Sequence, residues 1–127
     1  MYDVVADIPS YPEFLAWCND VNIVSQTPEE VVAELIIAYG ILDFSFTTRN
    51  SMQQDTFIQL TLVDGPFSDL QGEWLFTALD EQACKVSLEM DFMFDSPLTH
   101  KVLSGVFQKI VSTQLDAFQK RARSLYG

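Results

Sequence analysis

The longest regular pattern in the chain covers residues 97–126, which read PLTHKVLSGVFQKIVSTQLDAFQKRARSLY. Apolar residues recur there at steps of three and four, which predicts one amphipathic helix with a broad apolar stripe. Pro97 is tolerated in a first helical turn, and the Ser96 hydroxyl is suited to cap a free backbone N–H. At 1.5 Å per residue this helix is about 45 Å long, so it needs a sheet to cover it. The predicted stripe comprises Leu103, Val106, Phe107, Ile110, Val111, Leu115, Phe118, Ala122 and Leu125.

The preceding seventy residues alternate between apolar and polar positions, a period of two that is typical of antiparallel strands with one wet face. Strands are predicted over 20–26, 31–39 and 42–50, followed by a loop over 50–55. Three more strands are centred near Leu60, Trp74 and Leu88, separated by turns at 64–67 and 80–82. The prediction is one α+β domain over 1–127, a helix-grip fold in which a curved sheet wraps around the C-terminal helix.

The N-terminal residues predict two short helices before the sheet. The first covers 2–6 and is ended by Pro9, and Ser10 and Glu13 match a capping box that would begin a second. Residues three apart, Tyr11, Phe14 and Trp17, would then form one aromatic face. Core packing is the simpler interpretation of that face, and a gate over a cavity is the functional one.

Charge is divided sharply along the chain. Residues 1–96 carry seventeen acidic and two basic side chains, a net charge of −15, whereas residues 97–127 carry five basic and one acidic, a net charge of +4. Lys120, Arg121 and Arg123 are therefore the candidate contacts to an anionic membrane or to RNA. The alternative is that they complement the helix dipole, at up to about 1 kcal/mol each.

Several function classes are disfavoured by composition. A hydrophobic content of 48% argues against disorder, and no apolar run or leader predicts a membrane span or signal, so a cytoplasmic location is expected. Cys18 and Cys84 lack metal-ligand spacing, and buried reduced thiols are favoured over a disulfide. With one histidine, His100, and neither a nucleophile elbow nor a phosphate loop, no catalytic or metal-binding residues are predicted and an enzyme is not expected.

Three motifs resemble the coenzyme Q-binding START-domain family, which is polyketide cyclase/dehydrase-like and whose bacterial members are often named ribosome association toxin RatA. They are VADIPSYPEFLAWC at 5–18, FTTRN at 46–50 and LVDGPF at 62–67, the last followed by Leu70, Gly72, Trp74 and Phe76. The resemblance extends over the whole chain. It implies a START/Bet v 1-like helix-grip fold with a tunnel between sheet and helix, and binding of ubiquinone or a related polyprenyl quinone as cargo rather than as a catalytic cofactor.

The family resemblance leaves two partners open. A quinone carrier that supports respiration would touch an anionic membrane, peripherally at the inner membrane, whereas a ribosome association toxin would bind the large ribosomal subunit and block subunit joining. From periodicity alone a solid core is favoured, but a carrier needs an elongated apolar cavity of about 300 Å³ or more. Its expected lining comprises Phe14, Trp17, Phe46, Leu60, Leu62, Trp74, Phe76, Phe92, Leu103, Val106, Phe107, Ile110 and Val111.

One departure from the family concerns the start of the chain. Family members begin with a strand before the first helix, whereas Met1 already lies in the predicted helix. An absent first strand would leave backbone groups of its neighbour unpaired, which favours either a homodimer through that exposed sheet edge or a weakened first helix.

Overall fold

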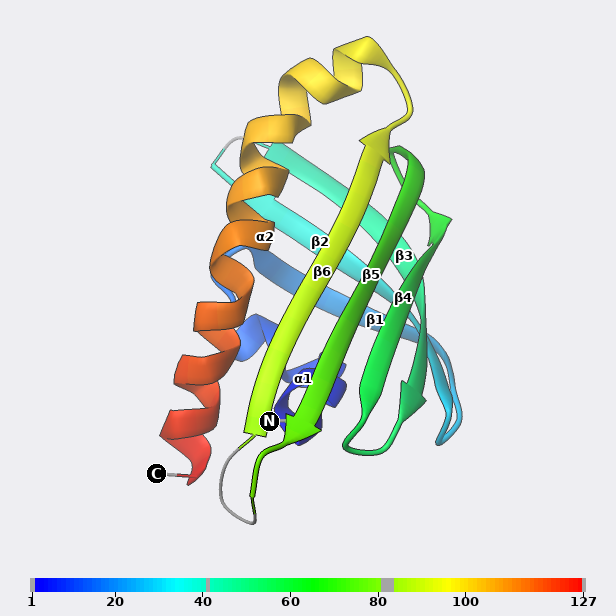
Figure 1. The fold of residues 1–127 in the computed structure, drawn as a ribbon. Coiled ribbons are helices and arrows are strands. Elements are labelled where there is room, and N and C mark those ends of the chain that lie inside the picture. The colour runs from blue at the N-terminus through cyan, green and yellow to red at the C-terminus, as the bar shows by residue number, and fades with distance from the viewer. Residues whose placement is uncertain (1, 41, 81–83, 127) are drawn as a thin grey trace.

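The computed structural model describes residues 2–40, 42–80 and 84–126, whose elements are shown in order in Figure 1. A short α-helix, α1 (Tyr2–Ala6), and a 3-10 helix, η1 (Ile8–Glu13), come first, and one long α-helix, α2 (Pro97–Tyr126), comes last. Between them the described residues form β1 (Cys18–Gln26), β2 (Glu30–Tyr39), β3 (Leu42–Gln53), β4 (Phe57–Asp64), β5 (Phe67–Ala78) and β6 (Cys84–Phe94).

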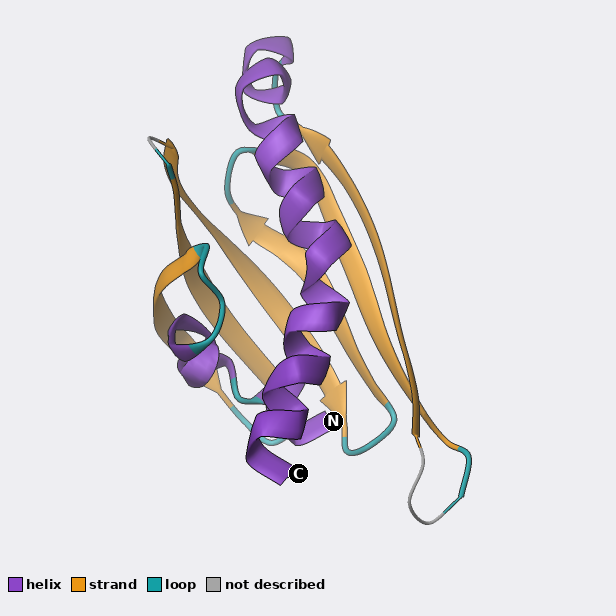
Figure 2. Ribbon diagram, turned by 90° about the vertical axis from the view of Figure 1, so that its left-hand side faces the viewer, coloured by secondary structure: helices purple, strands orange, loops and turns teal. Residues whose placement is uncertain are grey.

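The six strands form one antiparallel sheet in the order β1-β2-β3-β4-β5-β6, so each strand pairs with its neighbour in sequence. Figure 2 shows the sheet curving around α2, which lies across its concave face. The predicted α+β helix-grip fold is confirmed. β1 and β6 form the two edges of this sheet.

The apolar stripe explains how α2 is held against the sheet. Leu103, Phe107, Ile110 and Phe118 are buried, and the Ser96 hydroxyl accepts a hydrogen bond from the Thr99 backbone N–H at 3.1 Å, which confirms the predicted cap. The prediction for Leu125 is wrong, because this side chain is 51% exposed in a final turn that lies beyond the covered part of the helix.

Two local predictions are also wrong. The Ser10 hydroxyl donates to Asp7 Oδ2 at 2.6 Å instead of capping a second α-helix, and the residues around it form η1. Because its hydroxyl is bonded to Asp7, Ser10 does not supply the cap that the predicted second α-helix would need. β3 continues to Gln53, so the loop after it shrinks to the turn at 54–56, where Asp55 has a φ of 58°. The predicted turn at 80–82 falls largely outside the described residues, as does Ile41 in the reversal after Gly40.

The turn between β4 and β5 shapes the inner surface of the sheet. Gly65 has a φ of 146°, and a Cβ atom there would lie 2.7 Å from the Phe46 Cβ atom. Only glycine fits this approach without displacing Phe46. The turn predicted at 64–67 is confirmed, and it helps to place an aromatic ring on the concave face.

Candidate ligand-binding cavity

An apolar cavity of about 50 Å³ lies between α2 and the concave face of the sheet. It has room for a few water molecules, whereas a cavity that binds benzene measures about 150 Å³. The predicted volume of about 300 Å³ or more is therefore wrong for this structure. The lining residues come from η1, the turn before β1, five strands and α2: Ile8, Tyr11, Trp17, Ala33, Leu35, Phe46, Thr48, Asn50, Leu60, Leu70, Trp74, Met90, Phe107, Ile110, Val111 and Gln114.

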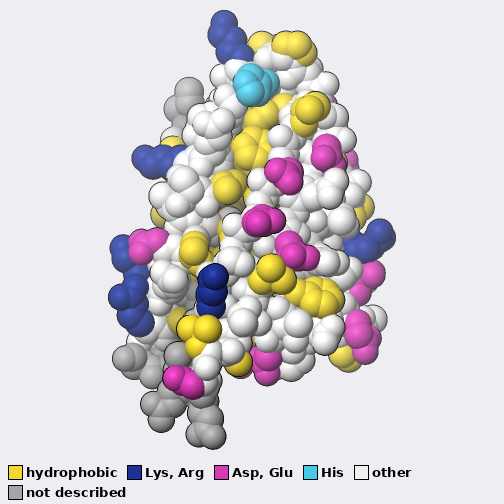
Figure 3. All heavy atoms as spheres, in the orientation of Figure 1, with side chains coloured by type: hydrophobic (Ala, Val, Ile, Leu, Met, Phe, Trp, Pro, Cys, Tyr) yellow, Lys and Arg dark blue, Asp and Glu magenta, His cyan; other side chains and the backbone are white. Residues whose placement is uncertain are grey.

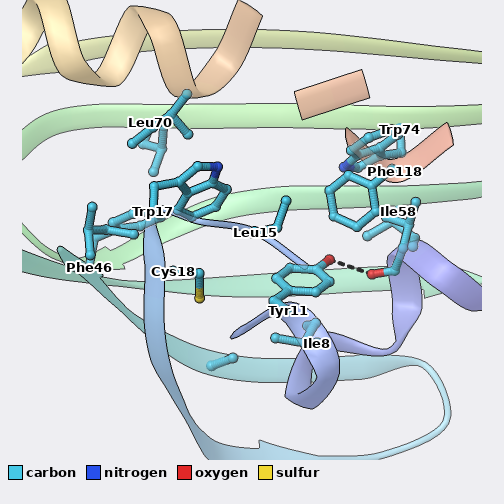
Figure 4. Close-up of a cluster of buried hydrophobic side chains, with 14 of the residues drawn as sticks. Ile8, Tyr11, Leu15, Trp17, Cys18, Phe46, Ile58, Leu70, Trp74 and Phe118 are labelled. Atoms are coloured by element: carbon cyan, nitrogen blue, oxygen red, sulfur yellow. Dashed lines mark hydrogen bonds between the residues drawn. The ribbon is translucent and has the colours of Figure 1, made fainter. Parts of the chain in front are cut away.

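Seven of the predicted site residues line this cavity: Trp17, Phe46, Leu60, Trp74, Phe107, Ile110 and Val111. Figure 4 shows several of them, with the Trp17 ring reaching toward Leu70. Phe76 and Leu103 are buried in the surrounding core, and Leu62, Phe92 and Val106 pack against it without lining the cavity. Phe14 lines a groove on the outer surface instead.

Sequence reasoning missed the polar part of the lining. Thr48 and Asn50 are each only 4% exposed, and the Thr48 hydroxyl donates a hydrogen bond to Asn50 Oδ1 at 2.8 Å. Alternation along the strand predicted at 42–50 puts Thr48 on the same face as Phe46, whereas Asn50 lies where the predicted loop over 50–55 begins. The signal that could have found it is the same alternation carried two residues further, because residues i and i+2 of a strand share a face.

The polar part of the lining carries hydrogen-bond donors. Asn50 Oδ1 accepts from the Thr48 hydroxyl, and the same side-chain amide carries the donor Nδ2. Trp17 and Trp74, which also line the cavity, each carry an indole N–H donor. A lining with these donors suits a ligand that presents oxygen acceptors.

Aromatic rings hold the N-terminal segment against α2. Phe118 is fully buried and contacts Tyr11, Phe14 and Trp74 edge-on, with ring centroids 5.1 to 5.3 Å apart. The Tyr11 hydroxyl donates to the Val5 carbonyl, drawn as a dashed line in Figure 4, and burial raises the pKa of this phenol far above its ordinary value. Tyr11 is thus a structural member of the cavity wall.

Cys18 lies beside this segment as a buried free thiol, which confirms the reduced state expected for it. Its Sγ contacts the Asp20 carbonyl at 3.7 Å, and burial raises the pKa of the thiol to about 11. A thiol that stays protonated is a poor nucleophile. The side chain of Cys84 lies outside the described residues.

The basic end of α2 is partly neutralised by acidic neighbours. Lys120 Nζ lies 3.1 Å from an Asp116 carboxylate oxygen, and Arg121 lies 3.3 Å from Glu13 Oε1, with its guanidinium 5.1 Å from the centre of the Phe14 ring. Figure 3 shows basic side chains mainly over α2 and acidic ones mainly over the sheet. The charge division along the sequence therefore corresponds to a division between α2 and the sheet.

The remaining candidates for chemistry are sparse. Among residues 2–40, 42–80 and 84–126, no group of three or more His, Cys, Asp or Glu side chains could hold a metal ion. His100 is exposed and meets the Phe94 ring edge-on at 5.8 Å between ring centres. None of the helices in the described ranges combines the length and the apolar character needed to cross a membrane.

The family model for "Polyketide cyclase / dehydrase and lipid transport" matches residues 1–119. The chain belongs to this family. Across all 127 residues, this polyketide cyclase/lipid transport family member is 40% identical to the protein named ribosome association toxin RatA in Pseudomonas aeruginosa, of which it covers 88%. It is 28% identical, over its whole length, to the protein named coenzyme Q-binding protein COQ10 homolog B, mitochondrial, of Xenopus laevis, of which it covers 54%.

A solved structure shares the fold of this family member. The Zhui aromatase/cyclase from Streptomyces sp. R1128 superposes with a TM-score of 0.83 at 18% sequence identity, covering 96% of this chain and 84% of that one. At this identity the similarity concerns the fold alone.

Proposed function

We propose that this family member binds a hydrophobic molecule with an oxygen-accepting head, such as ubiquinone or a related polyprenyl quinone, and carries it without changing it chemically. The observation that carries the proposal is the buried Thr48–Asn50 pair in an otherwise aromatic and aliphatic wall. A quinone carbonyl is a hydrogen-bond acceptor, and the buried side-chain amide of Asn50 carries hydrogen-bond donors at Nδ2. The family description and the name of the Xenopus relative support the same ligand class.

The small volume sets a condition on this function. A cavity of about 50 Å³ does not hold a six-membered ring, so side chains must move before a quinone head enters. Once inside, each methylene removed from water contributes about 0.8 kcal/mol, which is the driving force for binding an isoprenoid tail. An anionic membrane surface is the proposed place of loading and release.

The proposal is tested by filling the cavity from α2. Ile110→Trp places a large ring among the lining side chains and should reduce the quinone recovered with the purified protein at least tenfold. Val102→Trp is the matched control, because Val102 lies on the same helix and is 48% exposed. Organic extraction followed by mass spectrometry measures the bound quinone, and circular dichroism checks the fold. Equal quinone content in both variants, or none in the wild type, contradicts the proposal.

A second candidate function is association with the large ribosomal subunit. It is favoured by the 40% identity, over the whole chain, to a protein named ribosome association toxin. The exposed basic residues of α2 would make the phosphate contacts, whereas the acidic sheet would face away from RNA. Lys120 and Arg121 are already in ion pairs, which leaves fewer cations to contact RNA phosphates. We therefore place this function second.

A further inference from the structure

A surface groove of about 420 Å³ runs between the segment that follows η1 and the C-terminal half of α2. Its inner wall is formed by Phe14, Leu15 and Trp17, and its helix wall includes Ala117, Lys120 and Arg121. Unlike the inner cavity, this groove has a volume in the range of small-molecule sites, which is about 300–1,000 Å³.

Trp17 belongs to both spaces, since it lines the inner cavity and the groove. Its backbone is fixed: the Trp17 carbonyl accepts from the Ala38 N–H at 3.0 Å, and the following N–H, of Cys18, donates to the Leu15 carbonyl at 3.0 Å. Its side chain is buried and packs in the hydrophobic core. The Trp17 side chain is therefore a wall that the cavity and the groove share.

The charges around the groove are balanced. Lys120 is paired with Asp116, and Arg121 with Glu13. Each basic residue of the groove therefore has an acidic partner beside it. A neutral, apolar occupant fits this surface better than a phosphate or a carboxylate does.

We propose that the groove is the tail subsite of the quinone-type ligand, and that Trp17 separates it from the head subsite at Thr48 and Asn50. The ligand would place its head in the cavity and lead its apolar tail past Trp17 and along α2. This inference rests on the proposed function and adds the path of the tail. It also accounts for the small inner cavity, which needs to enlarge for the head only.

The test compares ligands that differ in tail length. Equilibrium dialysis measures the dissociation constants of ubiquinone with one isoprenoid unit and of decylubiquinone. The wild type should bind the decyl compound at least tenfold more tightly, and Ala117→Trp should remove most of that gain while changing the affinity for the short compound less than threefold. Gln71→Trp is the control, because Gln71 is exposed and lines a different groove, on the outer face of the sheet.

A second variant distinguishes a blocked groove from a folding defect as the cause of weaker binding. Ala16 is exposed on the opposite wall, so Ala16→Trp narrows the same groove without touching the core. If both variants keep the wild-type gain with tail length, or lose affinity equally for both compounds, the tail subsite is wrong while quinone binding stands. If the wild type binds neither compound, both the proposed function and this inference fail.

Discussion

At the scale of single residues, the Thr48–Asn50 pair separates a structural role from a binding role. Thr48→Val keeps the shape of the side chain but leaves Asn50 Oδ1 buried without its donor, which should lower the free energy of unfolding by about 1–3 kcal/mol. Replacing both residues, Thr48→Val with Asn50→Leu, removes donor and acceptor together. This double variant should unfold within about 1 kcal/mol of the wild type in urea titrations.

The double variant should nevertheless bind decylubiquinone about tenfold more weakly, a loss of about 1.4 kcal/mol, because it lacks the amide that we propose contacts the quinone head. Wild-type affinity in a double variant of wild-type stability would show that Asn50 does not contact the ligand. The two measurements together distinguish a head subsite from a buried hydrogen bond that serves only the fold.

Cys18 predicts a pH dependence of stability. Burial raises the pKa of its thiol to about 11 from an ordinary value of 9.0, so the folded state favours the protonated form. This contribution is complete below pH 9 and is lost as the pH rises from 9 through 11. Urea titrations between pH 8 and 11 should show the free energy of unfolding falling more steeply for the wild type than for Cys18→Ala. Parallel curves would contradict the assignment.

At the scale of elements, Phe118 joins α2 to the N-terminal segment and to β5. Its ring is 0% exposed and contacts Tyr11, Phe14 and Trp74, so Phe118→Ala should destabilise the fold by about 3–5 kcal/mol. Leu125→Ala, on the same helix, should change stability by no more than about 0.5 kcal/mol, because Leu125 is exposed. Thermal and urea denaturation of the two variants provide the comparison, and equal losses would mean that the helix is not anchored at Phe118.

The elements differ in how well the sequence predicts them. α2 is long and strongly periodic, so its period, its cap and most of its buried face follow from spacing alone. The residues around Ser10 match a capping box, but the Ser10 hydroxyl bonds to the Asp7 side chain and the segment forms the 3-10 helix η1. The end of β3 was missed because its polar residues at 50–53 resemble a loop, whereas in the sheet they pair with β4. For that reason Asn50 is missing from the residues predicted to line the site.

At the scale of the whole molecule, the division of charge gives a test between partners. Changing Lys120, Arg121 and Arg123 together to glutamine should weaken binding to anionic liposomes by up to about 1 kcal/mol per cation. If the ribosome is the partner, the same variant should co-sediment less with large subunits, and the slope of log affinity against log salt should flatten by about one unit per lost phosphate contact. Lys101→Gln with Lys109→Gln, nearer the other end of α2, is the control.

If neither assay responds, Lys120, Arg121 and Arg123 serve only the end of the helix, where Lys120 pairs with Asp116 and Arg121 with Glu13.

The volume of the interior is also a property of the whole molecule, and it could not be predicted from the sequence. Periodicity identifies which side chains face inward, but the space left between α2 and the sheet depends on how closely rings such as Phe107 and Trp74 interlock.

The sequential order of the sheet, with the covering helix last, has a consequence for how the protein is made. Each of β2–β6 pairs with the strand synthesised just before it, so short loops close one hairpin at a time. The aromatic face around Phe46 and Trp74 remains uncovered until residues 97–126 have left the exit tunnel. During that interval the nascent chain exposes the apolar face of the sheet, which can bind chaperones or aggregate. A hydrophobic molecule present at that stage could reach the open sheet directly, and α2 would then pack over it.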